Sequence, residues 1–251
     1  MFIIFWDYDG TLVDTETIYK DSLISFLKNN NYSLKEITDD FFYKNIAGKH
    51  PEEFLEKLEQ NGFIKPNLNI DPLDIKKYYT IYFDNLKPGE IKITPNIDSV
   101  IDNLSKNKNV IMCIASSTFR HDFVIKYKNV QNKIFNENFD IDKNIYLCGE
   151  IEGCKFKPSS DIYVYTFNDI VKKYNLNQTK NDKLVIVEDS IAGCKAGHDF
   201  KTKYEDKIDI NVIGYLGGSV IDNSSLLLEN GADIIIRNAN ELDKYLSNNS
   251  I

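Results

Sequence analysis

The chain has 251 residues, a formal net charge of −8, and 42% hydrophobic and 12% aromatic residues. This composition is typical of a globular protein with a proper core and excludes a disordered chain. No block of lysine and arginine stands out, which argues against nucleic acid or an anionic membrane surface as a partner.

The four cysteines are scattered without the spacing of a zinc site, and neither a signal-peptide pattern nor a bilayer-spanning stretch is visible. We therefore expect free thiols in a cytoplasmic protein.

The first strand is expected at residues 2–6, where five apolar residues run directly into an acidic segment. An entirely apolar run that ends near a glycine is typical of a strand buried on both faces of a parallel sheet. Asp7 and Asp9 follow at the carboxyl end, where open α/β sheets bind their ligands. One carboxylate at this spacing can attack or bind a metal while the other transfers protons. Gly10 permits a tight turn and a close approach to a ligand. The alternative is a polar loop without function.

From residue 110 on, strand patterns alternate with helical patterns, which predicts an α/β fold with a Rossmann-like doubly wound parallel sheet. Helical patterns occupy residues 15–29, 39–46, 51–61 and 71–86, before the strand patterns return at 110–115, 145–147, 184–187, 210–214 and 234–236. We therefore expect a core domain at residues 1–14 and 93–251, interrupted by an α-helical cap domain at residues 15–92. Turn residues at 87–90 and 94–96 are expected to form the return linker. A helical domain hinged over a site at the first strand can act as a lid.

Two later segments of the chain carry hydroxyl or lysine side chains that could bind phosphate. Ser116 and Ser117 come at the end of the predicted strand at 110–115, and their hydroxyl and N–H groups suit phosphate oxygens, although a cap on the following helix is an equal alternative. Lys157 precedes a proline that fixes its loop, so its ammonium group could neutralise a phosphoryl group in transfer. A solvated surface lysine is the alternative.

Two further carboxylates, Glu188 and Asp189, end the predicted strand at 184–187. Paired acids at such a position are costly unless they bind a metal or hydrogen-bond donors. Oxygen ligands favour a hard cation, with Mg²⁺ the first candidate. Asp189 or Ser190 could also serve as a helix N-cap, and both roles can hold together.

The four segments together resemble the four motifs of the haloacid dehalogenase superfamily of phosphohydrolases. They are DxDGT at 7–11, the hydroxyl at Ser116, the Lys-Pro pair at Lys157, and EDSxxG at 188–193. The first and last motifs are similar to those of the branch that contains β-phosphoglucomutase and small sugar-phosphate phosphatases. That branch carries a helical cap inserted after the first strand.

The resemblance implies a mechanism. Asp7 would attack phosphorus and form an aspartyl-phosphate, while Asp9 would protonate the leaving oxygen and then activate water. The implied Mg²⁺ ligands are Asp7, Asp9 through its backbone carbonyl, Asp189, and Glu188 in or next to the first shell. The implied phosphate contacts are Ser116, Lys157 and N–H groups near Asp9 and Gly10. Because Asp9 is present, dehalogenation is not expected: halide displacement needs no acid at that position.

Mutases of this branch carry a histidine and an arginine that hold a second phosphate, and Tyr19 and Pro51 take those places here. Lys49 or His50 in the cap, and Arg120 beside the phosphate site, could contact substrate instead; an exposed position is the alternative for each.

We therefore expect a Mg²⁺-dependent phosphatase that acts on a small phosphorylated metabolite, as a monomer or weak dimer. A β-phosphoglucomutase-like phosphomutase is the alternative, and a non-catalytic phospho-ligand binder is a third hypothesis. The intact Asp7, Asp9, Lys157 and Asp189 argue against the binder. The sequence does not name the substrate.

Overall fold

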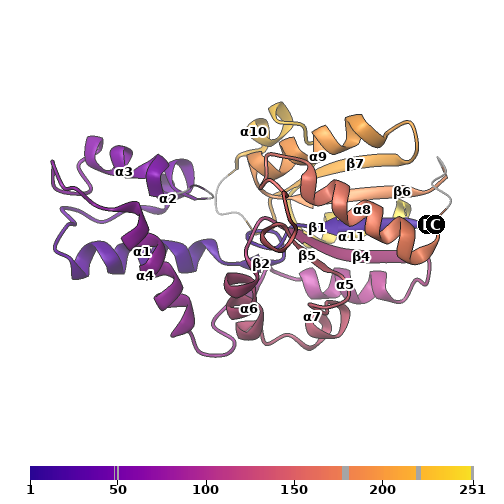
Figure 1. Cartoon of the computed structure of the whole chain (residues 1–251), viewed down its shortest axis with the longest axis horizontal. Helices are drawn as coiled ribbons and strands as arrows, with labels where there is room; N and C mark the ends of the chain where they lie inside the picture. The colour runs from indigo at the N-terminus through magenta and orange to yellow at the C-terminus, as the bar shows by residue number, and fades with distance from the viewer. Residues whose placement is uncertain (48, 50, 177–180, 219–221, 250–251) are drawn as a thin grey trace.

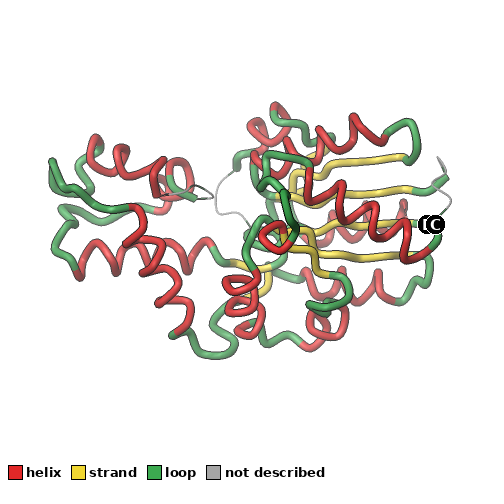
Figure 2. Tube along the Cα trace, in the orientation of Figure 1, coloured by secondary structure: helices red, strands yellow, loops and turns green. Residues whose placement is uncertain are grey.

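The structure is a computed structural model that describes residues 1–47, 49, 51–176, 181–218 and 222–249. Within this part of the chain, six strands form one parallel sheet in the order β5-β4-β1-β6-β7-β8 (Figure 1, Figure 2). Their bounds are β1 Phe2–Trp6, β4 Val110–Ser116, β5 Ile145–Leu147, β6 Lys183–Glu188, β7 Asp209–Tyr215 and β8 Ile234–Ile236. Each strand covers the segment predicted for it and extends it by at most one residue at either end. The predicted α/β fold with a doubly wound parallel sheet is confirmed.

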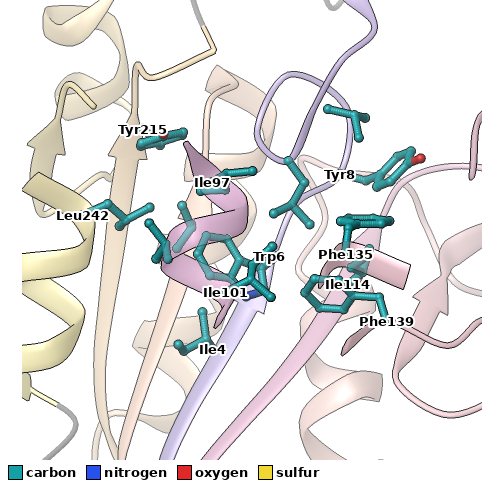
Figure 3. Packing of buried hydrophobic residues seen from close by; sticks show 14 of the residues in the cluster. Ile4, Trp6, Tyr8, Ile97, Ile101, Ile114, Phe135, Phe139, Tyr215 and Leu242 are labelled. Atoms are coloured by element: carbon teal, nitrogen blue, oxygen red, sulfur yellow. The ribbon is translucent and has the colours of Figure 1, made fainter. Parts of the chain in front are cut away.

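Strand β1 lies in the middle of the sheet and is buried along its whole length. Successive side chains of a strand point to opposite faces. Ile4 and Trp6 therefore pack in one hydrophobic cluster, and Ile3 and Phe5 pack in another on the opposite face. Figure 3 shows Ile4 and Trp6 in one cluster with Ile97 and Ile101, which lie on the helix at residues 97–105. The uninterrupted apolar run in the sequence is explained by this burial on both sides.

Helices cover both faces of the sheet. The cluster around Trp6 includes residues of α5 (Ile97–Ser105), α6 (Arg120–Asn129), α7 (Lys133–Asn138) and α11 (Ala239–Asn249). The opposite cluster includes residues of α8 (Asp161–Tyr174), α9 (Ile191–Tyr204) and α10 (Ser224–Glu229). A short 3₁₀ helix, η1 (Cys148–Glu150), follows β5. No helix in the described ranges is long and apolar enough to cross a membrane.

The helices predicted after the first strand are present as α1 (Glu16–Asn29), α2 (Asp39–Asn45), α3 (Pro51–Gln60) and α4 (Pro72–Asp84). They lie to one side of the sheet in Figure 1 and enclose a hydrophobic cluster of their own. That cluster includes Leu23, Phe26, Phe42, Phe54 and Ile75. An inserted helical unit is therefore what the structure describes, while the exact domain limits at residues 14/15 and 92/93 stay a prediction.

A short antiparallel pair at the two ends of the insert was not predicted. Strand β2 (Val13–Asp14) pairs with β3 (Lys92–Ile93), with Val13 opposite Ile93. The predicted return linker at 87–90 and 94–96 is thus interrupted by a strand. Two residues are too few to show the alternation that identifies a strand in a sequence. This pair ties the entry and exit of the helical unit together next to the end of β1.

Candidate active site

The parallel sheet brings the two acidic segments to one edge. Strands β1 and β6 are neighbours with Trp6 opposite Val187, so the residues that follow, Asp7 and Glu188, leave the sheet side by side. The Asp7 N–H donates to the Val187 carbonyl oxygen at 3.0 Å and continues this pairing beyond the strand. The carboxyl ends of adjacent parallel strands are therefore what assembles the site.

Three carboxylates gather at this edge. Asp7, Glu188 and Asp189 each offer an oxygen atom, and these atoms all lie within 4.8 Å of one another. Burial and the nearby charge of Glu188 raise the pKa of Asp7 from 3.8 to about 7. Burial and the charges of Asp7 and Glu188 likewise raise the pKa of Asp189 well above its ordinary value. Buried, mutually repelling oxygen ligands suit a hard divalent cation, so these residues fit Mg²⁺. The contribution of the Asp9 carbonyl stays a prediction.

Lys157 lies among these carboxylates. Its Nζ donates to Asp7 Oδ1 at 2.5 Å, to Glu188 Oε1 at 2.6 Å and to the Ala115 carbonyl oxygen at 2.9 Å. The side chain is only 5% exposed, so the alternative of a solvated surface lysine is wrong. Burial by itself lowers the pKa of Lys157, but the charges of Asp7 and Glu188 outweigh it and the pKa is raised. Lys157 is therefore a charged ammonium group that touches the predicted nucleophile.

The serine pair lies at the carboxyl end of β4, on the side of β1 opposite β6. Ser116 is the last residue of β4 and is buried, and the Ser117 Oγ accepts a hydrogen bond from the Lys157 N–H at 3.0 Å. Helix α6 begins only at Arg120 and has Phe119 at its N-cap, so the alternative of a serine cap is wrong. Ser117 thus ties this turn to the loop that carries Lys157. The phosphate contacts of Ser116 and Ser117 stay predictions.

The helix cap after β6 falls on Ser190. Its Oγ accepts from the Gly193 N–H at 3.0 Å, so Ser190 rather than Asp189 caps α9. Asp189 Oδ1 instead accepts from the Thr11 hydroxyl at 3.0 Å, and Glu188 Oε1 accepts from the Tyr163 hydroxyl at 2.5 Å. Both carboxylates are therefore held in place by hydroxyl donors, as oriented metal ligands usually are.

Gly10 leaves room for the carboxylate cluster. Its φ of +82° lies in the left-handed region that favours glycine. A Cβ at this position would lie 2.1 Å from Asp189 Oδ2, so no side chain fits without displacing that carboxylate. The space beside Gly10 is therefore taken by the side chain of Asp189, while the close approach of Gly10 to a ligand and its phosphate contact stay predictions.

Asp9 occupies a separate environment. Its Oδ1 accepts from the Thr15 hydroxyl at 2.7 Å, and its Oδ2 accepts from Lys126 Nζ at 2.5 Å. Lys126 comes from α6 and its side chain is 3% exposed. The two aspartates of the first motif thus have different partners: Asp7 has Lys157 and the acidic cluster, and Asp9 has Thr15 and Lys126. This separation suits two different tasks.

Sequence reasoning assigned no role to four residues that hold the carboxylates: Thr11, Thr15, Lys126 and Tyr163. A signal existed for Lys126, because it lies three residues after the buried Phe123 and so shares the inward face of α6. No comparable signal marked Tyr163, whose large apolar ring is typical of any core helix.

The predicted substrate contacts lie apart from this network. Arg120 is exposed and pairs with Glu150 at 3.2 Å and Asp142 at 2.9 Å. Lys49 Nζ donates to the Asn45 carbonyl oxygen at 3.1 Å, and burial together with nearby Lys57 lowers its pKa. His50 lies outside the described residues. Substrate contact by Arg120 or Lys49 stays a prediction.

Comparison with known proteins finds a family match for this chain. Residues 3–204 match the family model described as haloacid dehalogenase-like hydrolase. No curated protein matches the chain.

Among solved structures, a conserved haloacid dehalogenase-like protein of unknown function from Agrobacterium tumefaciens is 21% identical with a TM-score of 0.72, over 98% of this chain and 97% of that one. A HAD family hydrolase from Deinococcus radiodurans, with bound phosphate and sodium, is 18% identical with a TM-score of 0.71, over 98% and 95% of the two chains. A candidate β-phosphoglucomutase from Thermotoga maritima is 19% identical with a TM-score of 0.64, over 98% and 99%. These likenesses show a shared fold. With the family match over most of its length and the motif residues assembled at one sheet edge, the chain belongs to the haloacid dehalogenase-like hydrolase family.

Proposed function

We propose that this hydrolase is a Mg²⁺-dependent phosphatase of small phosphomonoesters that works through an aspartyl-phosphate on Asp7. The observation that carries the proposal is the contact of Asp7 with Lys157 inside a buried cluster with Glu188 and Asp189. A nucleophilic carboxylate can meet a phosphate dianion only where positive charge compensates both. The phosphate bound to the structurally similar Deinococcus radiodurans hydrolase supports the same ligand class.

The residues of this chain divide the reaction between them. An oxygen of Asp7 attacks phosphorus, and the bond from phosphorus to the alcohol oxygen breaks as that oxygen takes a proton from Asp9. In the second step, the Asp9 carboxylate takes a proton from water, whose oxygen attacks phosphorus and releases Asp7 and inorganic phosphate. Lys157 orients Asp7 and offsets the charge of the phosphoryl oxygens. Asp7, Glu188 and Asp189 would hold Mg²⁺, which when bound supplies the remaining positive charge.

The environment of Tyr19 favours a phosphatase over a phosphomutase. Tyr19 takes the place of the mutase histidine, and its ring packs against Tyr79 and Phe83 at centroid distances of 5.1 and 4.9 Å. Burial raises the pKa of Tyr19 to about 12, so it carries no charge for a second phosphate at neutral pH. A small phosphorylated metabolite is the proposed partner. A cytoplasmic location and a monomeric or weakly dimeric state stay predictions.

Phosphate release from a panel of sugar, polyol, glycolate and nucleoside monophosphates tests the proposal, with and without Mg²⁺. We expect release that needs Mg²⁺ and is abolished in Asp7→Asn. Asp21→Asn, which changes an exposed carboxylate on α1, is the matched control and should keep full activity.

Two other results would redirect the assignment. Conversion of a sugar 1-phosphate to the 6-phosphate without phosphate release would indicate a mutase. Tight phosphate binding without any turnover would indicate a binder. Unchanged activity in Asp7→Asn would refute the nucleophile.

A further inference from the structure

Lys126 is a buried lysine for which the proposed reaction has no role so far. Its side chain is 3% exposed, and its Nζ donates to Asp9 Oδ2 at 2.5 Å. Taking an ammonium group out of water is costly unless a partner compensates, so a buried lysine needs an explanation. Here the partner is the predicted general acid and base, 117 residues earlier in the chain.

The surroundings of Lys126 hold its ammonium group in one place. The rings of Tyr8 and Tyr19 lie 6.0 and 5.8 Å from Nζ, at distances typical of cation–π contacts. Tyr8 follows β1 and Tyr19 lies in α1, so the group is enclosed by the core and by the helical unit. With little freedom of its own, Lys126 can fix the carboxylate that it contacts.

The charges of the site explain why Asp9 needs such a partner. Among the described residues, Asp7, Glu188 and Asp189 form an acidic cluster in which Lys157 is the cation. A further carboxylate two residues from Asp7 is repelled by that cluster and would turn toward solvent. Thr15 holds one oxygen of Asp9 and Lys126 holds the other. A neutral hydroxyl cannot oppose the repulsion, but the ammonium group of Lys126 can.

We propose that Lys126 is a positioning residue for Asp9, which fixes the carboxyl group of Asp9 so that its acid form can transfer a proton to the leaving oxygen. The inference rests on the proposed phosphatase function. Lys126 acts through Asp9 and not on the substrate, so its loss should matter only where proton transfer matters. This gives a readout that a merely structural lysine would not affect.

Leaving-group dependence in Lys126→Met is the test. The kcat/KM reports the first irreversible step, in which the alcohol leaves, and p-nitrophenolate leaves without a proton whereas an alkoxide needs one. We expect kcat/KM for the best alkyl phosphate of the panel to fall about 100-fold and that for p-nitrophenyl phosphate to change less than about threefold. Lys126→Arg, which keeps the charge, should recover part of the loss. Lys128→Met, an exposed lysine on the same helix, should behave as wild type.

A double-mutant cycle completes the test. In an Asp9→Asn background, Lys126→Met should cause no further loss with the alkyl ester, because the residue it positions is gone. Equal losses with both esters, or an added loss in the Asp9→Asn background, would overturn the role of Lys126 while leaving the phosphatase in place. If Lys126→Met does not fold, Lys126→Gln serves in the same comparison. A wild-type chain that releases phosphate from neither ester would overturn the proposed function and this inference with it.

Discussion

Replacement of Lys157 by methionine removes the cation of the acidic cluster and keeps most of the apolar stem. In the structure Lys157 Nζ contacts both Asp7 and Glu188, and the Glu188 side chain is fully buried. The variant therefore leaves two buried carboxylates without their ammonium partner. Breaking a buried ion pair by removing one member typically costs about 3–5 kcal/mol of unfolding free energy.

The loss of unfolding free energy in Lys157→Met should depend on pH. The pKa of Asp7 is already about 7 with Lys157 present, because burial and Glu188 raise it, and removal of Lys157 raises it further. Below its pKa Asp7 is protonated, so it no longer repels Glu188. Above its pKa Asp7 is charged, and the folded variant has to bury two repelling carboxylates without a cation. We therefore expect the loss of stability to be larger at pH 8 than at pH 6 by about 1–3 kcal/mol in metal-free buffer.

Urea denaturation measures this directly. The single tryptophan, Trp6, is fully buried and immediately precedes Asp7, so its fluorescence reports unfolding of the site strand. Lys155→Met, an exposed lysine in the same loop, is the control and should change stability little. Mg²⁺ should restore part of the stability of Lys157→Met, since it binds only the folded cluster. A loss below about 1 kcal/mol at pH 8, or one that does not vary with pH, would refute the reasoning.

Three further predictions concern the same edge of the sheet. Gly10→Ala should destabilise by about 1–3 kcal/mol more than Gly62→Ala in urea denaturation, because both have positive φ but only a Cβ at Gly10 meets Asp189; equal losses would contradict the clash. In metal-free buffer, the stability of the wild type relative to Asp7→Asn should fall as the pH rises from 3.8 to about 7. The reason is that Asp7 keeps its proton in the folded state over this range, whereas the unfolded chain releases it. Thermal melts of both chains measure the difference, and a difference that does not vary with pH would refute the prediction. Thr11→Val removes the hydroxyl bonded to Asp189, and we expect Mg²⁺ binding about tenfold weaker by calorimetry; unchanged affinity would show that this bond does not orient the ligand.

The main features of the site were predictable because they are local in sequence. An apolar run that ends in acids identifies a buried strand and its ligand-binding end in a few residues, as at Asp7 and at Glu188. The alternation of strands and helices then requires a parallel sheet, whose carboxyl ends share one edge. The helical insert was also visible, because residues 15–29 carry apolar residues at near-helical spacing. Pro51 and Pro72 suit the first positions of α3 and α4.

The residues that support the site were not predictable in the same way. Lys126 and Tyr163 contact carboxylates that lie 117 and 25 residues away. The spacing from Phe123 places Lys126 on the inward face of α6, but it does not say which carboxylate the ammonium group meets. A tyrosine in a core helix resembles a packing residue. The two-residue strands β2 and β3 carry no periodic signal at all.

The sequence by itself therefore determined the class of fold and the residue types of the candidate site: two aspartates after a buried strand, a lysine loop and a second acidic strand end. Only the tertiary structure decided which lysine contacts which carboxylate. Lys157 contacts Asp7 and Glu188, and Lys126 contacts Asp9. The physical reason is that the order β4-β1-β6 and the packing of α6 beside β1 are set by contacts distributed over the whole core. Charge pairs between distant segments follow from that packing and have no local pattern of their own.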